Sequence, residues 1–380
     1  MDLSYTPEEE AFRAHVRGWI ETNAPAAGSL KTLDEMRAWQ RKLHAAGFIG
    51  TSWPREYGGA GLSPMEQAIL NEELARARAP QVVNAMAIWW VGPALMKYGT
   101  EEQKKRFIPK ILTAEEIWAT GYSEPSSGSD MAAAKTRAVR DGDEYVVTGQ
   151  KIWTTMAHES EWCFLLVRTS REGPKHAGLT ILLVDIRTPG VTVRPLRQIT
   201  GDAEFNELFL DQVRVPVSQR LGAEGQGWAV VMSALVDERS SLATAIRVDE
   251  IFARLCETVR AAGLGRDPLW RQRLGALATD CAIVRTSNLR NLSDQLHGRL
   301  NPGLASALKL FCSELNQRLS AAGHDALGAG GLLLPGGTDA PERTSWAYKM
   351  LYDRCRTIAG GTSEVQRGVI AQRVLGLPRG

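Results

Sequence analysis

The stretch EYVVTGQKIW, residues 144–153, decides the fold expected for this chain. It is rich in β-branched and aromatic residues, and the turn sequence Asp141-Gly142-Asp143 precedes it. This composition is typical of a β-strand that follows a tight turn. Similar short runs follow between turn residues, at 162–169, 179–186, 191–196 and 208–215. We therefore expect a compact β domain over residues 118–222.

Helical periodicity surrounds this β region on both sides. Before it, apolar residues recur at helical spacing from Thr6 to about Pro109, with Ser, Thr or Pro near several expected helix starts. After Gly225-Gln226-Gly227 the helical spacing returns, in segments long enough to form antiparallel bundle helices. The expected fold is mainly α with a central β domain. An N-terminal α-helical domain would span residues 1–117 and a C-terminal α-helical bundle domain residues 223–380.

Charge and composition exclude several classes of function. The 380 residues include 45 Lys and Arg and 43 Asp and Glu, with no long run of either sign, so nothing indicates binding to nucleic acid or to an anionic membrane. The start, MDLSYTPEEEAFRAHV, is acidic and polar, which argues against a signal peptide. No apolar run approaches the roughly 18 residues of a spanning helix. The five cysteines are widely spread and lack CxxC spacing, so we expect buried thiols in a reducing cytoplasm and no metal site.

Common catalytic motifs are absent from the sequence. It contains no HExxH, no Walker lysine loop and no GxSxG elbow. The glycines at 222, 225 and 227 lack dinucleotide-binding spacing and follow no βαβ unit. A Rossmann-type nucleotide site is therefore disfavoured.

An ordered series of motifs instead resembles the acyl-CoA dehydrogenase family over essentially the whole chain. Each match alone is weak, because WPREYGG could be a capping turn and YSEPSSGSD a polar loop. So many matches in the family's order, in step with the division into helix, strand and helix, make coincidence a poor explanation. The series runs through WPREYGGAG (53–61), GTEEQKKRFIPKILTAEE (99–116), YSEPSSGSD (122–130), TGQKIWTTMA (148–157), FNELFLDQVRVP (205–216), LVDER (235–239), GGTSEVQR (360–367) and RVLGLP (373–378).

The resemblance implies an FAD enzyme with a β-barrel-like middle domain and a C-terminal four-helix bundle. A flavin ring needs an apolar wall and hydrogen-bond donors at its pyrimidine edge and N5, where reduction places negative charge. By resemblance, Tyr122 and Ser123 contact the pyrimidine side, and Trp153 and Thr155 flank the ring and its N5 edge. Ser129 lies by the pantetheine chain. Taken alone, Trp153 could equally be a core residue and Ser129 a turn hydroxyl. The resemblance also assigns Gly128, Ser129, Thr362 and Glu364 to the cofactor and Gly361 to the substrate.

The catalytic base is displaced relative to many members of the family, which carry a glutamate immediately before the Gly-Thr pair. This chain has Gly360 there, and glycine cannot supply the carboxylate that removes a thioester α-proton. In the isovaleryl-CoA and long-chain types the glutamate lies on a helix of the C-terminal domain beside an arginine, the place that Glu238 and Arg239 occupy here. The resemblance makes Glu238 the candidate base, Arg239 a contact for CoA or pantetheine, and Gly360 an N–H donor to the thioester oxygen. The alternative for Glu238 is a solvated helix acid; Asp237, about 100° away around a helix, cannot face the same site.

The implied reaction is α,β-dehydrogenation of an acyl-CoA or acyl-carrier thioester to the 2-enoyl product, with electrons passed to electron-transfer flavoprotein. Gly360 beside Ala359, where relatives often have tyrosine, leaves volume for a bulky, branched or cyclic acyl group. In residues 261–266 the Arg and the Phe of the family's Arg-x-x-Phe-Gly motif are both missing from their places, with Arg260 or Arg266 as an alternative source of the arginine. Residues 325–329 lack the Gln of the family's Gln-x-x-Gly-Gly element. We expect a homotetramer, with a heterotetramer containing a paralogous chain as the alternative. Two other functions are alternatives to the dehydrogenase. The chain could be a non-catalytic partner subunit, or it could be a flavin oxidase or monooxygenase on this fold.

Overall fold

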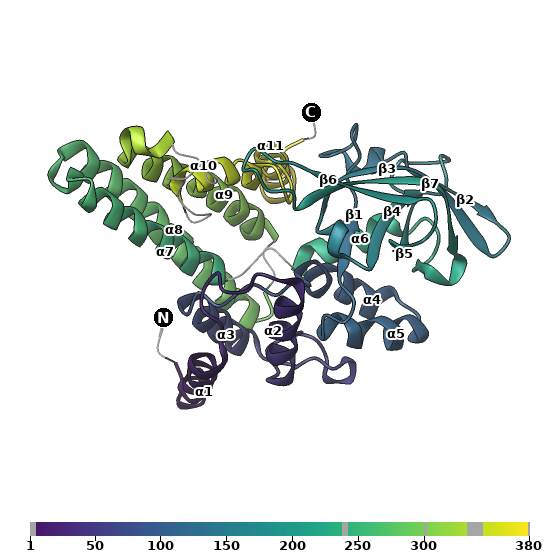
Figure 1. The fold of residues 1–380 in the computed structure, drawn as a ribbon, viewed down its shortest axis with the longest axis horizontal. Coiled ribbons are helices and arrows are strands. Elements are labelled where there is room, and N and C mark those ends of the chain that lie inside the picture. The colour runs from purple at the N-terminus through teal and green to yellow at the C-terminus, as the bar shows by residue number, and fades with distance from the viewer. Residues whose placement is uncertain (1–4, 238–241, 300–301, 333–344, 379–380) are drawn as a thin grey trace.

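The structure, a computed structural model, has helices at both ends of the chain and strands in the middle (Figure 1). It describes residues 5–237, 242–299, 302–332 and 345–378. Four N-terminal helices begin at capping boxes. In each box the hydroxyl of a Ser or Thr N-cap accepts a hydrogen bond from the backbone N–H of a Glu or Gln three residues later. The side chain of that Glu or Gln in turn accepts the backbone N–H of the N-cap residue. These helices are α1 (Pro7–Asn23), α2 (Leu33–Ala45), α3 (Pro64–Arg76) and α5 (Glu101–Leu112); the short α4 (Gly92–Tyr98) precedes α5.

The middle of the chain forms one mixed sheet. Its strands lie in the order β6-β7-β3-β2-β4-β5-β8, and β1 pairs with β4 in parallel. The strands are β1 (Trp118–Gly121), β2 (Arg137–Asp141), β3 (Glu144–Thr155), β4 (Trp162–Arg168), β5 (Leu179–Asp185), β6 (Val191–Leu196), β7 (Phe205–Pro216) and β8 (Arg220–Leu221).

The two faces of β4 and β5 contribute to different cores, because successive side chains of a strand point in opposite directions. Phe164 and Leu183 pack against the N-terminal helices. Leu165 and Leu182 face the other way and share a core with Tyr145 of β3 and further residues of β7. The sheet therefore curls around a core of its own, as expected of a barrel-like domain.

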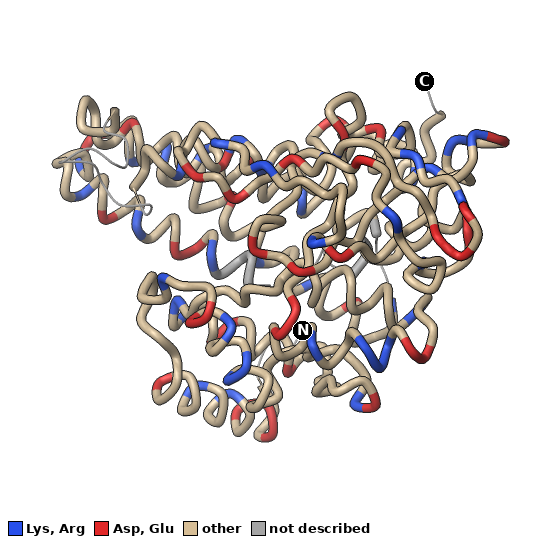
Figure 2. Tube along the Cα trace, turned by 45° about the vertical axis from the view of Figure 1, so that its right-hand side comes forward, with Lys and Arg blue, Asp and Glu red and all other residues tan. Residues whose placement is uncertain are grey.

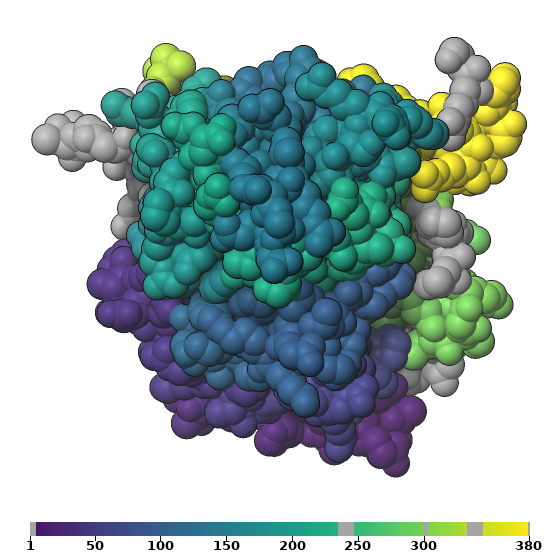
Figure 3. All heavy atoms as spheres, turned by 90° about the vertical axis from the view of Figure 1, so that its right-hand side faces the viewer, coloured from purple at the N-terminus to yellow at the C-terminus, as the bar shows by residue number. Residues whose placement is uncertain are grey.

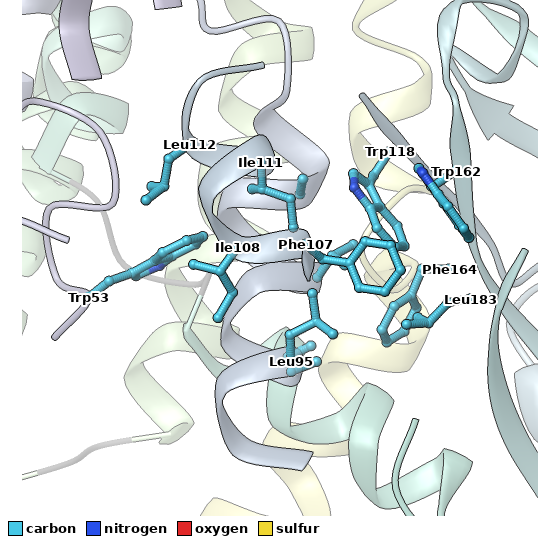
Figure 4. Close-up of a cluster of buried hydrophobic side chains, with 14 of the residues drawn as sticks. Trp53, Leu95, Phe107, Ile108, Ile111, Leu112, Trp118, Trp162, Phe164 and Leu183 are labelled. Atoms are coloured by element: carbon cyan, nitrogen blue, oxygen red, sulfur yellow. The ribbon is translucent and has the colours of Figure 1, made fainter. Parts of the chain in front are cut away.

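Aromatic side chains join the N-terminal helices to the sheet (Figure 4). The ring centroids of Phe107, from α5, and Trp162, from β4, lie 4.9 Å apart in an edge-on arrangement. Trp118 of β1 stacks on Trp162 at 5.5 Å. These contacts make the first two parts of the chain one continuous packing unit.

The C-terminal part is a bundle of helices with its own core. The long helices α7, α8 and α9 pack against one another, and the short helices α10 and α11 lie against α9 (Figure 1). The preceding helix, α6, instead packs on α4 and β5. The bounds are α6 (Gly227–Asp237), α7 (Leu242–Ala261), α8 (Pro268–Leu296), α9 (Pro302–Ala326), α10 (Trp346–Tyr352) and α11 (Ser363–Val369).

Polar contacts fix the three parts relative to one another. The Arg37 guanidinium of α2 lies 2.6 Å from a carboxylate oxygen of Glu161, beside β4. The Tyr348 hydroxyl of α10 donates to Asp202 in the β6–β7 turn at 2.6 Å. Acidic and basic residues are interspersed along the whole trace (Figure 2), consistent with the net charge of +2.

The arrangement confirms the expected fold class, mainly α with a central β domain. Cys163, Cys281 and Cys312 are buried, and burial raises the pKa of each thiol to about 12. Cys256 and Cys355 are half-buried, so the expectation of buried thiols holds fully for three of the five. In the parts of the chain that the structure covers, no helix combines the length and apolar character needed to span a bilayer.

Candidate active site

The segment after β1 forms a closed turn that carries the first group of predicted flavin contacts. Glu124 and Ser127 exchange two backbone hydrogen bonds of 3.0 Å, which close the turn. Tyr122 and Ser123, just before it, are half-buried. Gly128 and Ser129, just after it, are exposed, which leaves the Ser129 hydroxyl accessible to a ligand.

A buried ion pair holds this turn against strand β3. The Lys151 ammonium lies 2.9 Å from Glu124 Oε1 and also donates to the Tyr122 carbonyl oxygen at 3.1 Å. The Glu124 carboxylate accepts two further N–H groups, from Lys135 and Thr136. Burial alone would raise the pKa of Glu124, but the Lys151 ammonium and these donors lower it below its ordinary value. The segment at Tyr122 is therefore anchored by charge as well as by backbone bonds.

Trp153 and Thr155 stand on an irregular part of β3 beside that segment. The Ile152 N–H donates to the Ser123 carbonyl at 2.9 Å, so the two predicted flavin-contacting segments are adjacent. The register with β7 shifts between Lys151 and Thr154, and Trp153 adopts a left-handed φ of 60°. A bulky residue with this φ is an outlier of the kind found at functional sites. The Trp153 indole is 58% exposed and packs edge-on against Phe205.

Asn206 fixes the backbone at this bulge from strand β7. The side chain is fully buried, and its amide donates to the carbonyls of Thr154 at 3.0 Å and Glu204 at 3.1 Å. Its carbonyl oxygen lies 3.0 Å from Nδ1 of His158. The Met156 N–H donates to the Glu204 carbonyl at 2.8 Å. These bonds hold the strand on both sides of Thr155.

Gly360 and Gly361 form the second part of the candidate site, on the loop before α11. Their φ values are 65° and 90°, which favour glycine over every other residue. A Cβ at 360 would meet only Lys309 Cε, at 3.8 Å, so backbone conformation rather than space selects glycine there. In the described residues the Gly360 N–H has no hydrogen-bond acceptor. Gly360 is exposed, and the role predicted for its N–H, as donor to the thioester oxygen, stays a prediction.

Neighbouring side chains hold this loop by its carbonyl groups. Gln366 Nε2 donates to the Gly360 carbonyl at 3.0 Å. Lys309 Nζ, from α9, donates to the carbonyls of Gly361 and Arg356. A Cβ at 361 would approach Gln366 Nε2 to 2.7 Å, which a shift of that flexible side chain could relieve, so φ is the main reason for glycine at this position.

Thr362 and Glu364 lie at the start of α11. The Thr362 hydroxyl accepts the Val365 N–H as the helix N-cap. Bonding to backbone N–H, and then to the Thr362 hydroxyl, lowers the pKa of the exposed Glu364 carboxyl. Both residues line a depression of about 460 Å³ that also includes Ser363. In the described part of the chain, the buried Ser363 Oγ and Gln366 Oε1 have no hydrogen-bond partner.

The two predicted carriers of charge, Glu238 and Arg239, lie outside the described residues. The backbone on either side is helical, with α6 ending at Asp237 and α7 beginning at Leu242. Their predicted roles as base and substrate contact therefore stay predictions.

The β6–β7 turn connects the two halves of the candidate site. Asp202 in this turn accepts the hydroxyl of Tyr348, which precedes the glycine loop in the chain. Glu204, two residues on, binds the N–H of Met156 beside the Trp153 bulge. The structure therefore brings together Tyr122, Ser123, Trp153 and Thr155, and places the segment that leads to Gly360 against the same turn.

Sequence reasoning missed the buried residues whose hydrogen bonds and ion pair hold the backbone of the site in place. In the sequence, Glu124, Lys151 and Asn206 stand out only as members of longer motifs. A signal was present for Lys151, because alternation from Tyr145 and Val147 points it inward, and a buried lysine needs an anionic partner. No comparable signal marks Asn206. Among the described residues no cluster of His, Cys, Asp and Glu suits a metal ion.

Comparison with known proteins extends over the whole chain. The family models of the acyl-CoA dehydrogenase N-terminal, middle and C-terminal domains match residues 6–115, 119–213 and 225–375. Acyl-CoA dehydrogenase IpdE1 of Mycobacterium tuberculosis is 41% identical over 383 residues, which cover 97% of this chain and 98% of that protein.

Two solved structures are similar in fold and length. The steroid ACAD Tcur3481-Tcur3483 superposes with a TM-score of 0.88 at 32% identity, covering all of both chains. A chain of the ChsE4-ChsE5 complex from Mycobacterium tuberculosis superposes with a TM-score of 0.86 at 34% identity, again over both full chains.

Proposed function

The chain belongs to the acyl-CoA dehydrogenase family, and from this premise we propose that it oxidises the Cα–Cβ bond of a bulky acyl-CoA thioester in an FAD-dependent reaction. The observation that carries the proposal is the Gly360 N–H, which has no acceptor among the described residues and lies on a loop, residues 358–362, where φ favours glycine and the sequence has no carboxylate. Such a site needs its base from another element, and the sequence offers Glu238.

The described residues fit a flavin. The exposed Trp153 indole offers an apolar wall, and the half-buried Ser123 and Thr155 hydroxyls lie on the adjacent backbone. Near Gly360, Ser363 Oγ and Gln366 Oε1 have no hydrogen-bond partner within the described chain, which makes them polar atoms suited to the rest of the cofactor. We propose that Tyr122, Ser123, Gly128, Ser129, Trp153, Thr155, Thr362 and Glu364 hold FAD. FAD would supply the acceptor for the hydride that leaves Cβ.

The chain's own part in the reaction is to acidify and remove the α-proton. A thioester α-proton is weakly acidic, so developing negative charge on the carbonyl oxygen must be stabilised. In this proposal the N–H of Gly360 donates to that oxygen, with Gly361 beside it at the substrate. Glu238 takes the proton as general base, and Arg239 binds the CoA or pantetheine part.

Replacing Glu238 by Gln tests the base. Loss of a general base costs roughly 10²–10⁴ in rate, so kcat should fall by that factor while acyl-CoA still binds. An Asp237→Asn variant is the matched control, because it removes the neighbouring carboxylate and should keep most of the activity. Near-full turnover in Glu238→Gln would remove this residue from the mechanism.

Two observations support the proposal that the acyl group is bulky. Ala359 and Gly360 are small and exposed in the described chain, and only Lys309 Cε approaches a Cβ built at 360. A similar protein of known structure is described as a steroid ACAD. We expect kcat/KM to be higher for a ring-containing acyl-CoA than for butyryl-CoA and octanoyl-CoA. Preference for short straight chains would contradict this part of the proposal.

We further propose that the chain works in a heteromeric assembly with a paralogous partner. The motif positions near residues 261–266 lack the family's Arg and Phe, which contact the pyrophosphate end of FAD, and two similar structures are described by pairs of different proteins. The chain purified alone should be colourless or hold little FAD, and should gain flavin when mixed with such a partner. Stoichiometric FAD in the chain alone would indicate the homotetramer instead.

Electron-transfer flavoprotein is the proposed acceptor, in a reducing cytoplasm that suits five free cysteines. Turnover should then depend on this acceptor and consume almost no oxygen. Oxygen consumption in step with product would identify the alternative, a flavin oxidase or monooxygenase. A flavin-free chain that stays inert in every assembly would identify a non-catalytic partner subunit.

A further inference from the structure

Lys309 reaches from α9 to the loop that carries Gly360 and holds this loop at two points. Its Nζ donates to the carbonyl oxygen of Gly361 and, at 3.2 Å, to that of Arg356. The chain that follows the loop lies at the surface, next to the β domain (Figure 1 and Figure 3). The two carbonyl groups flank residues 357–360, so a single ammonium group closes the segment that ends with Gly360.

Holding a carbonyl group requires a hydrogen-bond donor but no charge. In the same region Gln366 donates to the Gly360 carbonyl at 3.0 Å, and Gln317, also on α9, donates to the Asp353 carbonyl at 3.2 Å. A half-buried ammonium group costs more, because its charge loses part of its hydration and its long side chain loses rotamer freedom. The charge of Lys309 therefore calls for a role beyond the two hydrogen bonds.

The positive charge of Lys309 lies beside Gly360. A Cβ built on Gly360 would lie 3.8 Å from Lys309 Cε, the carbon that carries the ammonium group. The charge also acts across the loop: bonding to backbone N–H is the largest cause that lowers the pKa of the Glu364 carboxyl, and Lys309 is a further cause. Salt screens a partly buried charge less than an exposed one. A negative charge that forms at the Gly360 N–H is therefore close enough for Lys309 to stabilise it.

We propose that Lys309 is a positioning residue for the α,β-dehydrogenation, which keeps the Gly360 N–H directed at the thioester oxygen and stabilises the negative charge that develops there. The inference rests on the proposed function, in which that oxygen accepts the Gly360 N–H. As the α-proton leaves for Glu238, the electron pair of the broken C–H bond moves toward the thioester oxygen, and the Lys309 ammonium keeps its own protons. Charge that is already in place needs no reorganisation during the reaction, which lowers the barrier.

Three substitutions separate the charge from the two hydrogen bonds. Lys309→Gln keeps N–H donors and removes the charge, Lys309→Arg keeps both, and Lys309→Met removes both. Arg354→Gln is the matched control, because it also removes a positive charge shortly before Gly360 in the chain. Arg354 is exposed, and within the described residues its side chain forms no hydrogen bond or ion pair.

The first measurement uses the native assembly and requires no turnover. A 3-ketoacyl-CoA with a ring-containing acyl group has an acidic proton on Cα, and its enolate absorbs in the ultraviolet. The pH at which half of the bound ligand is ionised reports how strongly the site stabilises negative charge on the thioester oxygen. Lys309→Gln and Lys309→Met should weaken this stabilisation roughly 10- to 100-fold and so raise that pH by about one to two, a smaller effect than the roughly 10²–10³-fold of a direct oxyanion donor. Lys309→Arg and Arg354→Gln should stay close to wild type.

The second measurement is steady-state turnover of the acyl-CoA substrate. In Lys309→Gln, kcat should fall by the same factor while KM changes little, because the interaction strengthens only as charge develops. A purely structural lysine would give another pattern. Lys309→Gln would then keep its activity, and only Lys309→Met would lose activity together with a lower unfolding midpoint.

The ionisation of the bound 3-ketoacyl-CoA decides the inference, and Lys309→Gln provides the test even if Lys309→Met does not fold. The same ionisation in Lys309→Gln as in wild type would overturn the role of the charge. An equal change in Arg354→Gln would also overturn it, because the position of the charge would then not matter. Both outcomes leave the proposed function intact. A wild-type protein that ionises the bound ligand no more readily than water does would instead contradict the proposed function, since nothing in the site would stabilise the thioester oxygen.

Discussion

Lys151 Nζ and Glu124 Oε1 form a 2.9 Å ion pair in which both side chains are buried, 0% and 5% exposed. The pair links the segment at Tyr122 to the strand that carries Trp153. Removing two charges from water is costly, and attraction and additional hydrogen bonds must compensate for it. Here the Tyr122 carbonyl and the N–H groups of Lys135 and Thr136 supply those bonds. The pair is therefore a fixed support beneath both predicted flavin-contacting segments.

Replacing Lys151 by Met should strongly destabilise the folded protein. The variant leaves Glu124 charged, buried and without its cation, which costs about 3–5 kcal/mol in comparable pairs. Chemical unfolding measured by circular dichroism reports the change. Lys175→Met is the control, because its pair with Asp130 is about half exposed and is worth less than about 1 kcal/mol. Equal destabilisation by the two variants would contradict a structural role for the buried pair.

The same pair predicts a pH dependence of stability. Because the folded pKa of Glu124 is below its ordinary value of 4.5, its contribution is fully present above that value and is lost as pH falls through the folded pKa. The stability difference between wild type and Glu124→Gln should therefore shrink as pH falls from 7 toward 3. Unfolding midpoints at several pH values check this. A difference independent of pH would mean that Glu124 is not ionised in the fold.

Local patterns predicted the layout, but not the contacts that depend on residues distant in sequence. Alternation in 144–153 predicts a strand, yet the bulge that turns Trp153 outward depends on its pairing with β7 and on Asn206. Likewise, helical periodicity groups α6 with the helices after it. Its apolar residues Val230 and Val231 instead fill a core built from α4 and β5, which no local pattern encodes.

Gly360→Ala should destabilise the protein by about 1–2 kcal/mol, the cost of a left-handed conformation for a residue with a Cβ. Gly275 offers a control, because it lies in α8 with open space around it. Gly275→Ala should stabilise the fold by up to about 1 kcal/mol through helix propensity.

A Gly360→Glu substitution added to the Glu238→Gln variant should fail to restore its activity, because the same φ strains the loop. Full rescue would show that position 360 accepts the base.

Asn206→Leu should weaken flavin binding beyond its effect on stability. Leucine keeps the volume but removes the donors that hold the backbone at Thr154 and Glu204, at a cost of about 1–3 kcal/mol. Without them the Trp153 bulge, whose φ of 60° is intrinsically strained, should relax toward a regular strand. Asn288→Leu is the control, since among the described residues that buried amide bonds to the Val284 carbonyl of its own helix alone. Unfolding midpoints and FAD dissociation constants of both variants, in the native assembly, separate the two effects. If both variants lose the same stability and the same flavin affinity, Asn206 supports the fold in general and does not position the flavin site.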